Sequence, residues 1–163
     1  MNSIDQDLAD IRRLTRIALP ASHTYLYRLG VALYCFASIS SFMAEVICYM
    51  DPRQNRTDLE TKMGGQLLSI FNQAVAGIEH SAPEAFTAGQ ETSQLFTSLN
   101  DERSDIIHAY PITDKTDNQI LHRRKDKAQK YFEVTDEFLN NFIARLHQVN
   151  DGLYRIRSIL RPL

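Results

Sequence analysis

The sequence is poor in the residues that mark several classes of protein. It contains no tryptophan, six glycines and two cysteines in 163 residues. So little glycine excludes a collagen-like fibre, and two cysteines are too few for a small disulfide-stapled domain. With 44% hydrophobic and 23% charged residues, the composition argues against disorder and predicts a single globular domain over residues 1–163.

An excess of charge of one sign is also lacking. Lysine and arginine total 18 against 20 acidic residues, which leaves a net charge of −2. Such a chain does not attract nucleic acid as a whole, so any RNA binding has to come from a local basic patch. Glycine-rich phosphate loops and the G-x-S-x-G motif are absent from the sequence. Because His23, His80 and His147 show no ligand spacing, we predict no metal site and no cofactor.

The cysteines and the longest apolar stretch bear on the cellular compartment. Cys35 and Cys48 are predicted on one helix, where their separation of about 20 Å excludes a disulfide between them. Unpaired thiols fit a reducing cytoplasm, and no basic-then-apolar signal segment opens the chain. The stretch Val31–Met50 contains three serines and Glu45, which is too polar for a membrane span. We therefore expect a buried core helix in a cytoplasmic protein.

Hydrophobic periodicity predicts a mainly α-helical chain. The last helix has the clearest pattern, because its apolar residues alternate three and four positions apart from Leu139 to Leu160. The central helix is apolar around most of its surface, which is typical of a helix packed on several sides. The expected helices are a short one at about 4–14, the central one at 25–50, a long one at 58–79, a third from 84 or 90 to 108, and the last one.

A β-hairpin is predicted between the third long helix and the last one. Its arms are Ile120–Arg123 and Tyr131–Val134, which are β-prone and flank a polar basic turn. Thr57 or Asp58 is expected to cap the helix at 58–79, and Thr135 to cap the last helix. The predicted fold is an up-and-down bundle of four to five helices with a small β-hairpin inserted before the last helix.

A charged cluster interrupts the apolar stripe at the end of the third helix. The position that continues the stripe between Leu99 and Ile106 holds Arg103. An inward-facing charge is costly unless it is paired or opens into a cleft, and Glu45 is the candidate buried partner. Asp105 and His108 are three residues apart on the same helix, so the carboxylate can hold the imidazole in one tautomer. Pro111 is expected to end the helix within a turn of His108.

Basic residues gather in the predicted hairpin. In one interpretation these basic side chains form a clamp that binds RNA phosphates with salt-dependent affinity. Tyr110 would then stack on unpaired bases. Plainer interpretations also stand: the basic run is a solvated turn, and Arg103 pairs with Asp101 or Glu102 at an ordinary helix end. The clamp residues are Arg123, Arg124, Lys125 and Lys127.

The segment Arg103-Ser-Asp-Ile-Ile-His108 resembles the Arg-x(4–6)-His motif of the HEPN superfamily, small helical bundles common in prokaryotic conflict systems. The resemblance covers about residues 25–160 and includes the central apolar helix, the basic hairpin and the terminal amphipathic helix. Ser104 stands where family members commonly carry Asn, Asp or His. The resemblance implies a metal-independent endoribonuclease of toxin or abortive-infection type, acting as a homodimer whose two motifs meet across the interface.

In that interpretation, His108 is the general base or acid in attack of a ribose 2′-hydroxyl on the adjacent phosphate. Arg103 would stabilise the phosphorane, with Asp105 as orienter and Ser104 as a further hydrogen-bonding group. The alternative is a catalytically inactive bundle that binds a nucleotide, RNA or a partner protein such as an antitoxin. A third interpretation is a dimerisation module that uses the helix at 139–160 as its interface.

Overall fold

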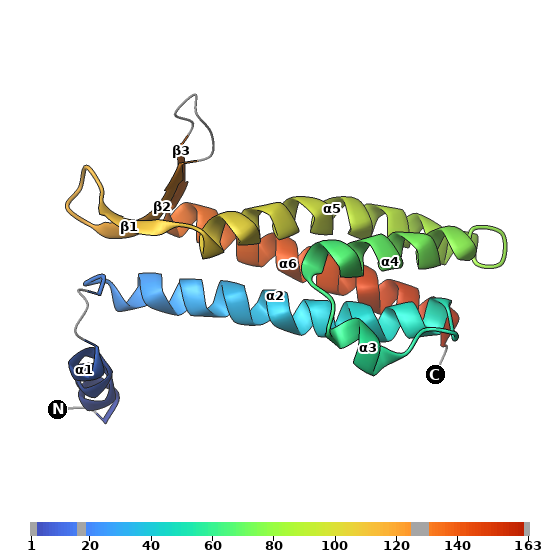
Figure 1. Ribbon diagram of the computed structural model, residues 1–163, viewed down its shortest axis with the longest axis horizontal. Coiled ribbons are helices and arrows are strands. Elements are labelled where there is room, and N and C mark those ends of the chain that lie inside the picture. The colour runs from blue at the N-terminus through green and yellow to red at the C-terminus, as the bar shows by residue number, and fades with distance from the viewer. Residues whose placement is uncertain (1–2, 16–18, 125–130, 162–163) are drawn as a thin grey trace.

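The computed structural model describes residues 3–15, 19–124 and 131–161. In these residues the chain forms six helices and one three-stranded antiparallel sheet (Figure 1). The predicted helical bundle with a hairpin before the last helix is confirmed. In chain order the elements are α1 (Ser3–Leu14), α2 (His23–Met50), α3 (Arg56–Glu60), α4 (Gly64–Gly77), α5 (Pro83–Ile107), β1 (Tyr110–Thr113), β2 (Gln119–Arg124), β3 (Tyr131–Val134) and α6 (Asp136–Leu160).

Helices α2, α4, α5 and α6 lie side by side and enclose the hydrophobic core (Figure 1). The rings of Phe36, Phe96 and Phe142 join three of these helices, with centroids 5.2 and 6.5 Å from that of Phe36. The apolar seam of α6 is buried in this core from Leu139 to Ile156. Because the chain itself covers this seam, the interpretation that made it the dimer interface is wrong.

Helix α2 is the central core helix that its apolar composition predicted. Ser22 caps it, and the serine side chain accepts a hydrogen bond from the Tyr25 amide at 3.1 Å. Met43 and Ile47 have no exposed surface. By length and composition α2 is also apolar enough to cross a membrane, with a mean hydropathy of 1.8 over a window of which 39% is buried. The core helix of a bundle passes the same test, so this property alone assigns no location.

The helix predicted at 58–79 is divided into α3 and α4, which corrects the sequence interpretation. Asn55, rather than Thr57 or Asp58, caps α3, because its side chain accepts hydrogen bonds from the amides of both residues at 2.9 and 3.3 Å. The new start at Gly64 depends on a close approach that periodicity does not reveal. A Cβ atom at this position would overlap Oδ1 of Asn100 on α5, so a larger residue here would require the Asn100 side chain to move.

The sheet lies at one end of the bundle, next to the end of α5 (Figure 1). Strands β2 and β3 are the arms of the predicted hairpin and pair with Arg123 opposite Phe132. Strand β1, which the sequence analysis missed, pairs with β2 and sets Tyr110 opposite His122. Pro111 is tolerated in β1 because this strand forms an edge of the sheet, where a missing N–H can face solvent.

A buried tyrosine fastens the sheet to α2. The Tyr25 hydroxyl donates a hydrogen bond to the Val134 carbonyl and accepts one from the Leu121 amide, both at 2.9 Å. Burial raises the pKa of Tyr25 above its ordinary value, so the hydroxyl keeps the proton that it donates. One side chain of the central helix therefore sets the position of both hairpin strands.

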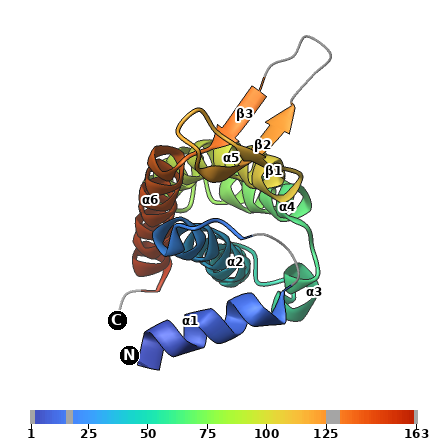
Figure 2. The same cartoon turned by 90° about the vertical axis from the view of Figure 1, so that its left-hand side faces the viewer.

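Helix α1 lies apart from the four long helices. It is found at the same end of the bundle as the sheet but on the opposite side of α2 (Figure 2). Its apolar face is largely uncovered, because Leu14 is 84% exposed and Ile4 is 62% exposed. A hydrogen bond of 2.7 Å from Arg12 Nη2 to the Pro20 carbonyl connects α1 to the segment that leads into α2.

Candidate functional site at the end of helix α5

The residues of the predicted motif occupy the last turn of α5 and the position after it. The helix ends at Ile107, and His108 is its C-cap, with an amide that donates to the Ser104 carbonyl at 3.1 Å. Pro111 lies three residues after His108, in β1. The predicted helix end within a turn of His108 is therefore confirmed. The imidazole is exposed at the surface of the protein.

Arg103 is half-buried and lies over an aromatic ring. Its guanidinium carbon is 5.7 Å from the centroid of the Phe36 ring, a distance within the range of a cation–π contact. Within the part of the chain that the structure describes, no hydrogen bond or ion pair involves this guanidinium. The five N–H donors of Arg103 are thus held in place by packing and are available to a ligand.

Arg103 lines a cleft of about 540 Å³ that lies between α2, α3, α4 and the end of α5. His108 is not among the residues that line it, so the two candidate catalytic groups of one chain face different surroundings. Sequence analysis missed the other residues of this cleft, because no local pattern brings four separate segments together. They are Leu33, Phe36, Ala37, Ser40, Ser41, Leu59, Glu60, Lys62, Met63, Gly64, Leu67 and Ile107.

Asp105 makes a contact that the sequence did not predict. It is buried, and its Oδ1 lies 2.7 Å from Nη1 of Arg123 on β2. The sequence analysis had placed this carboxylate beside His108 as its orienter and had placed Arg123 in an RNA clamp. The structure instead joins α5 to the sheet through the pair, because the two side chains approach only when the sheet folds over the helix end.

Two other arginines of the long helices are paired with carboxylates. Glu102 pairs with Arg145 on α6 in a two-pronged contact, one arm of which measures 3.0 Å, so the pairing of Arg103 with Glu102 proposed by the plainer interpretation is wrong. Arg28 on α2 lies 2.8 Å from Asp136 at the start of α6. The guanidinium of Arg103 differs from these two, because no carboxylate pairs with it in the part of the chain that the structure describes.

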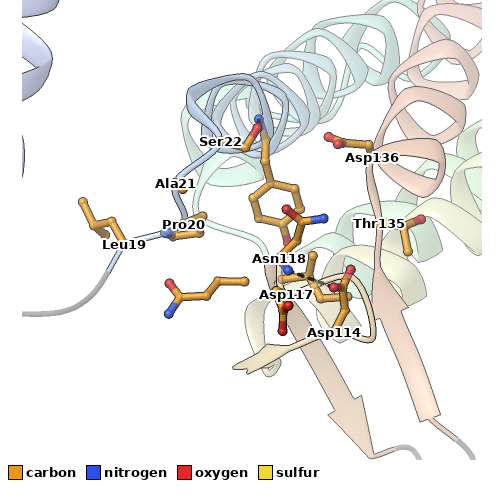
Figure 3. A pocket seen from close by; sticks show the side chains of 12 residues that line it. Leu19, Pro20, Ala21, Ser22, Asp114, Asp117, Asn118, Thr135 and Asp136 are labelled. Carbon is orange, nitrogen blue, oxygen red and sulfur yellow. Dashed lines mark hydrogen bonds between the residues drawn. The ribbon is translucent and has the colours of Figure 1, made fainter.

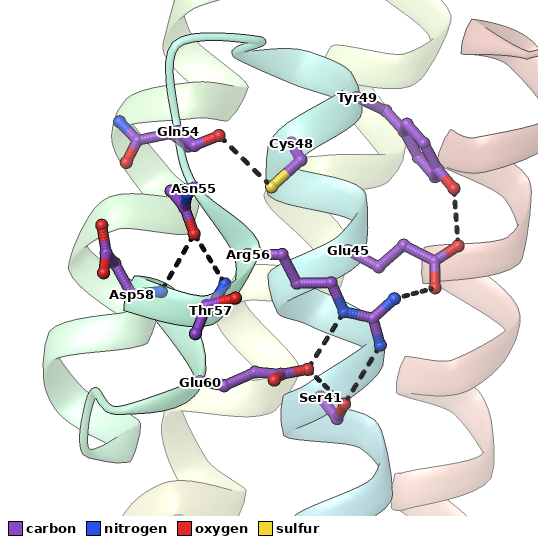
Figure 4. A network of polar contacts seen from close by, with 10 residues as sticks. All are labelled: Ser41, Glu45, Cys48, Tyr49, Gln54, Asn55, Arg56, Thr57, Asp58 and Glu60. Atoms are coloured by element: carbon purple, nitrogen blue, oxygen red, sulfur yellow. Dashed lines mark hydrogen bonds and ion pairs between the residues drawn. The ribbon is translucent and has the colours of Figure 1, made fainter.

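Glu45 has partners other than Arg103. Its Oε2 lies 3.2 Å from Nη1 of Arg56, and the Tyr49 hydroxyl donates to its Oε1 at 2.7 Å (Figure 4). Arg56 also contacts Glu60 at 3.0 Å. The prediction that Glu45 is the buried partner of Arg103 is therefore wrong. Sequence analysis placed Glu45 on the central helix but did not show that α3 brings Arg56 to it.

The predicted clamp is distributed unevenly over the sheet. Arg124 is exposed at the end of β2, whereas Arg123 is half-buried in its pair with Asp105. Lys125 and Lys127 lie outside the described residues. Tyr110 is half exposed on β1 and lies beside the buried ring of His122, with centroids 5.5 Å apart.

A second pocket lies at the junction of α2, the turn between β1 and β2, and the start of α6 (Figure 3). It measures about 390 Å³ and is lined by the carboxylates of Asp114, Asp117 and Asp136. Hydrogen bonds from the Asn118 amide and the Thr116 side chain lower the pKa of Asp114. Because these groups carry negative charge, the pocket disfavours phosphate. Among the described residues no cluster of His, Cys, Asp and Glu is suited to a metal ion.

Comparison with known protein families, with curated proteins and with solved structures finds no match. The resemblance to the HEPN superfamily therefore depends on the Arg103–His108 motif and on the helical architecture around it. The structural features that bear on it are the end of α5, the cleft at Arg103 and the sheet beside His108.

Proposed function

We propose that this chain is a metal-independent endoribonuclease of HEPN type that acts as a homodimer. The observation that carries the proposal is the guanidinium of Arg103, which is fixed over Phe36 without a carboxylate partner in the described chain. An exposed imidazole, His108, follows at the end of the same helix. A group that binds phosphate and a group that transfers protons are the two requirements of the reaction.

In the proposed reaction a ribose 2′-oxygen attacks the adjacent phosphorus, while His108 of one copy accepts the hydroxyl proton. The bond from phosphorus to the 5′-oxygen of the next nucleotide breaks, and His108 of the second copy protonates this leaving oxygen. The products carry a 2′,3′-cyclic phosphate and a 5′-hydroxyl. Arg103 donates hydrogen bonds to the phosphate oxygens, which gain negative charge in the phosphorane.

The divergence of the two side chains within one copy is the reason for proposing a dimer. Arg103 faces the cleft, whereas His108 lies outside it. A two-fold axis near the end of α5 would bring each Arg103 toward His108 of the other copy, as an isologous interface does. Ile107 is 48% exposed and Tyr110 is 49% exposed next to this point, so apolar surface is available for such an interface.

The sheet provides the proposed route for RNA. Arg124 and Tyr110 supply an exposed charge and an aromatic ring on the strands that adjoin the end of α5. Lys125 and Lys127 remain predicted members of this clamp. The acidic pocket at Asp114 would repel an RNA strand, so the proposed path avoids the turn between β1 and β2.

A short DNA strand that contains one ribonucleotide and is labelled at both ends tests the proposal. We expect cleavage at that ribose in the presence of EDTA, and a decrease of about 10²–10⁴-fold for His108→Ala. Arg103→Ala should lower the rate by about 10²–10³-fold. His147→Ala and Arg155→Ala, which change exposed residues of α6, are the matched controls. An inactive wild type, an unaffected His108→Ala variant or cleavage of the all-deoxy strand would contradict the proposal.

Binding of RNA without cleavage is the second candidate function. It is favoured by the engagement of Asp105 with Arg123, since the carboxylate expected to orient His108 is used to attach the sheet. In this case wild type would bind a single-stranded RNA and leave it intact. Arg124→Gln should then lower the slope of log K against log salt by about one charge. Expression of a cleaving toxin arrests growth, and a binding module does not, so a growth assay separates the two candidates.

A further inference from the structure

The cleft at Arg103 has the properties of a small-molecule site. Its volume of about 540 Å³ falls within the range of roughly 300–1,000 Å³ typical of ligand pockets. Apolar side chains from four segments form most of its wall, and a few polar groups converge on it. This combination separates it from the acidic pocket at Asp114, whose wall includes three carboxylates.

The charge that the cleft presents is positive. Arg103 has no acidic partner in the described chain, and Lys62 lies at the rim on the connection between α3 and α4. The one carboxylate in the lining, Glu60, is engaged by Arg56 at 3.0 Å and accepts a hydrogen bond from Ser41 at 3.2 Å. An anion entering the cleft would therefore meet two cations and one carboxylate that is already compensated.

The wall of the cleft suits a flat apolar group. Phe36 provides the floor beneath Arg103, and Ala37, one residue further along α2, leaves open space at the surface. Met63 is 74% exposed at the rim. Its flexible thioether side chain adapts to an apolar ligand, which would cover surface that the protein leaves in water.

We infer that this cleft binds a small phosphomonoester whose phosphate pairs with Arg103 and Lys62 and whose flat apolar or aromatic body packs against α2. A phosphomonoester carries about −1.5 to −2 charges at neutral pH, which matches two cations better than a carboxylate does. The guanidinium fork binds two phosphate oxygens at once. This inference goes beyond RNA cleavage. It shares Arg103 with the proposed ribonuclease but uses neither His108 nor the sheet.

Calorimetric titration of the full chain with phenyl phosphate, adenosine 5′-monophosphate, inorganic phosphate, phenol and benzoate tests the inference. We expect both phosphomonoesters to bind, and inorganic phosphate, phenol and benzoate to bind at least about tenfold more weakly, since each lacks one part of the recognised group. Absence of binding by both phosphomonoesters overturns the inference. If inorganic phosphate binds as tightly as the phosphomonoesters, the cleft does not recognise an apolar group. If benzoate binds as tightly as phenyl phosphate, the cleft does not select a phosphate.

Variants locate the site. Arg103→Gln should weaken phenyl phosphate binding about tenfold or more. Ala37→Phe fills the cleft without changing any charge and should abolish binding. Ser38→Phe is its matched control, because Ser38 is the next exposed residue of α2 but lines a different groove, toward α6. Unchanged binding by Ala37→Phe, or equal loss by Ser38→Phe, contradicts the location.

Failure of this inference is distinguishable from failure of the proposed ribonuclease. His108→Ala should bind phenyl phosphate as wild type does, while it loses cleavage if the ribonuclease proposal is right. The denaturation midpoint of each variant in urea reports whether it is folded. If Arg103→Gln is destabilised, Lys62→Ala provides a second test, because Lys62 is exposed and its replacement is expected to weaken binding without unfolding the protein.

Discussion

Asp105 and Arg123 form an ion pair whose removal separates a structural role from a catalytic one. The Asp105 side chain is 11% exposed and the Arg123 side chain 31% exposed, with Oδ1 and Nη1 2.7 Å apart. The pair connects the last turn of α5 to the middle strand of the sheet. The perturbation is a double-mutant cycle made of Asp105→Asn, Arg123→Gln and the double variant.

The expected loss of stability depends on how deeply the Asp105–Arg123 pair is buried. Breaking a fully buried pair costs about 3–5 kcal/mol, but water reaches Arg123 and screens part of this interaction. We therefore expect Asp105→Asn to lower the free energy of unfolding by about 2–3 kcal/mol, the range of a hydrogen bond to a charged group. For a chain of this size, such a loss lowers the melting temperature by about 4–12 °C. The coupling energy between the two sites should be about 1–2 kcal/mol.

Urea unfolding of the four proteins measures the coupling, and the RNA cleavage assay is run on the same samples. Arg124→Gln is the matched control, because it removes an exposed charge from the next residue and should change stability by less than about 0.5 kcal/mol. A coupling energy below about 0.5 kcal/mol would refute the structural role. Loss of cleavage by Asp105→Asn at unchanged stability would show that Asp105 acts on His108, as the sequence first suggested.

Tyr25→Phe removes the hydroxyl that bonds the backbone of β2 and β3, and we expect it to lower the free energy of unfolding by about 1–3 kcal/mol; an unchanged urea midpoint would argue against this role. Alanine is favoured over glycine in a helix by about 0.5–1 kcal/mol. A Cβ at Gly30 meets nothing within 4 Å, whereas one at Gly89 lies 2.6 Å from a methyl carbon of a valine in α4. Gly30→Ala should therefore raise the melting temperature and Gly89→Ala should lower it, and equal shifts would contradict the packing. The hydrogen bond from Arg53 lowers the pKa of Asp51 from 3.8 to about 2, so its stabilising effect is complete above the ordinary pKa and is lost as the pH falls toward 2. Across this window wild type should lose more stability than Asp51→Asn; parallel pH profiles would show that the pairing does not persist in solution.

Much of the fold was predictable because the periodicity and capping of a helix depend on residues that are close together in the sequence. The seam of α6 and its cap at Thr135, whose hydroxyl oxygen accepts a hydrogen bond from the Phe138 amide at 3.1 Å, needed only periodicity and capping rules. The hairpin arms were also found from β-prone residues on either side of a polar turn. Strand β1 was missed, because Pro111 argued for a break and only the pairing with β2 makes its segment a strand.

The sequence by itself determined where most of the long helices lie, where α5 ends, and that a lone arginine interrupts its apolar stripe. Tertiary structure alone decided the partners: Asp105 with Arg123, Glu45 with Arg56, and Arg103 with the ring of Phe36. The physical reason is that capping and periodicity act between residues a turn apart. A charge at the end of one helix instead pairs with whichever group another segment brings within a few ångströms. The cleft at Arg103, lined by four separate segments, exists only once these segments have packed.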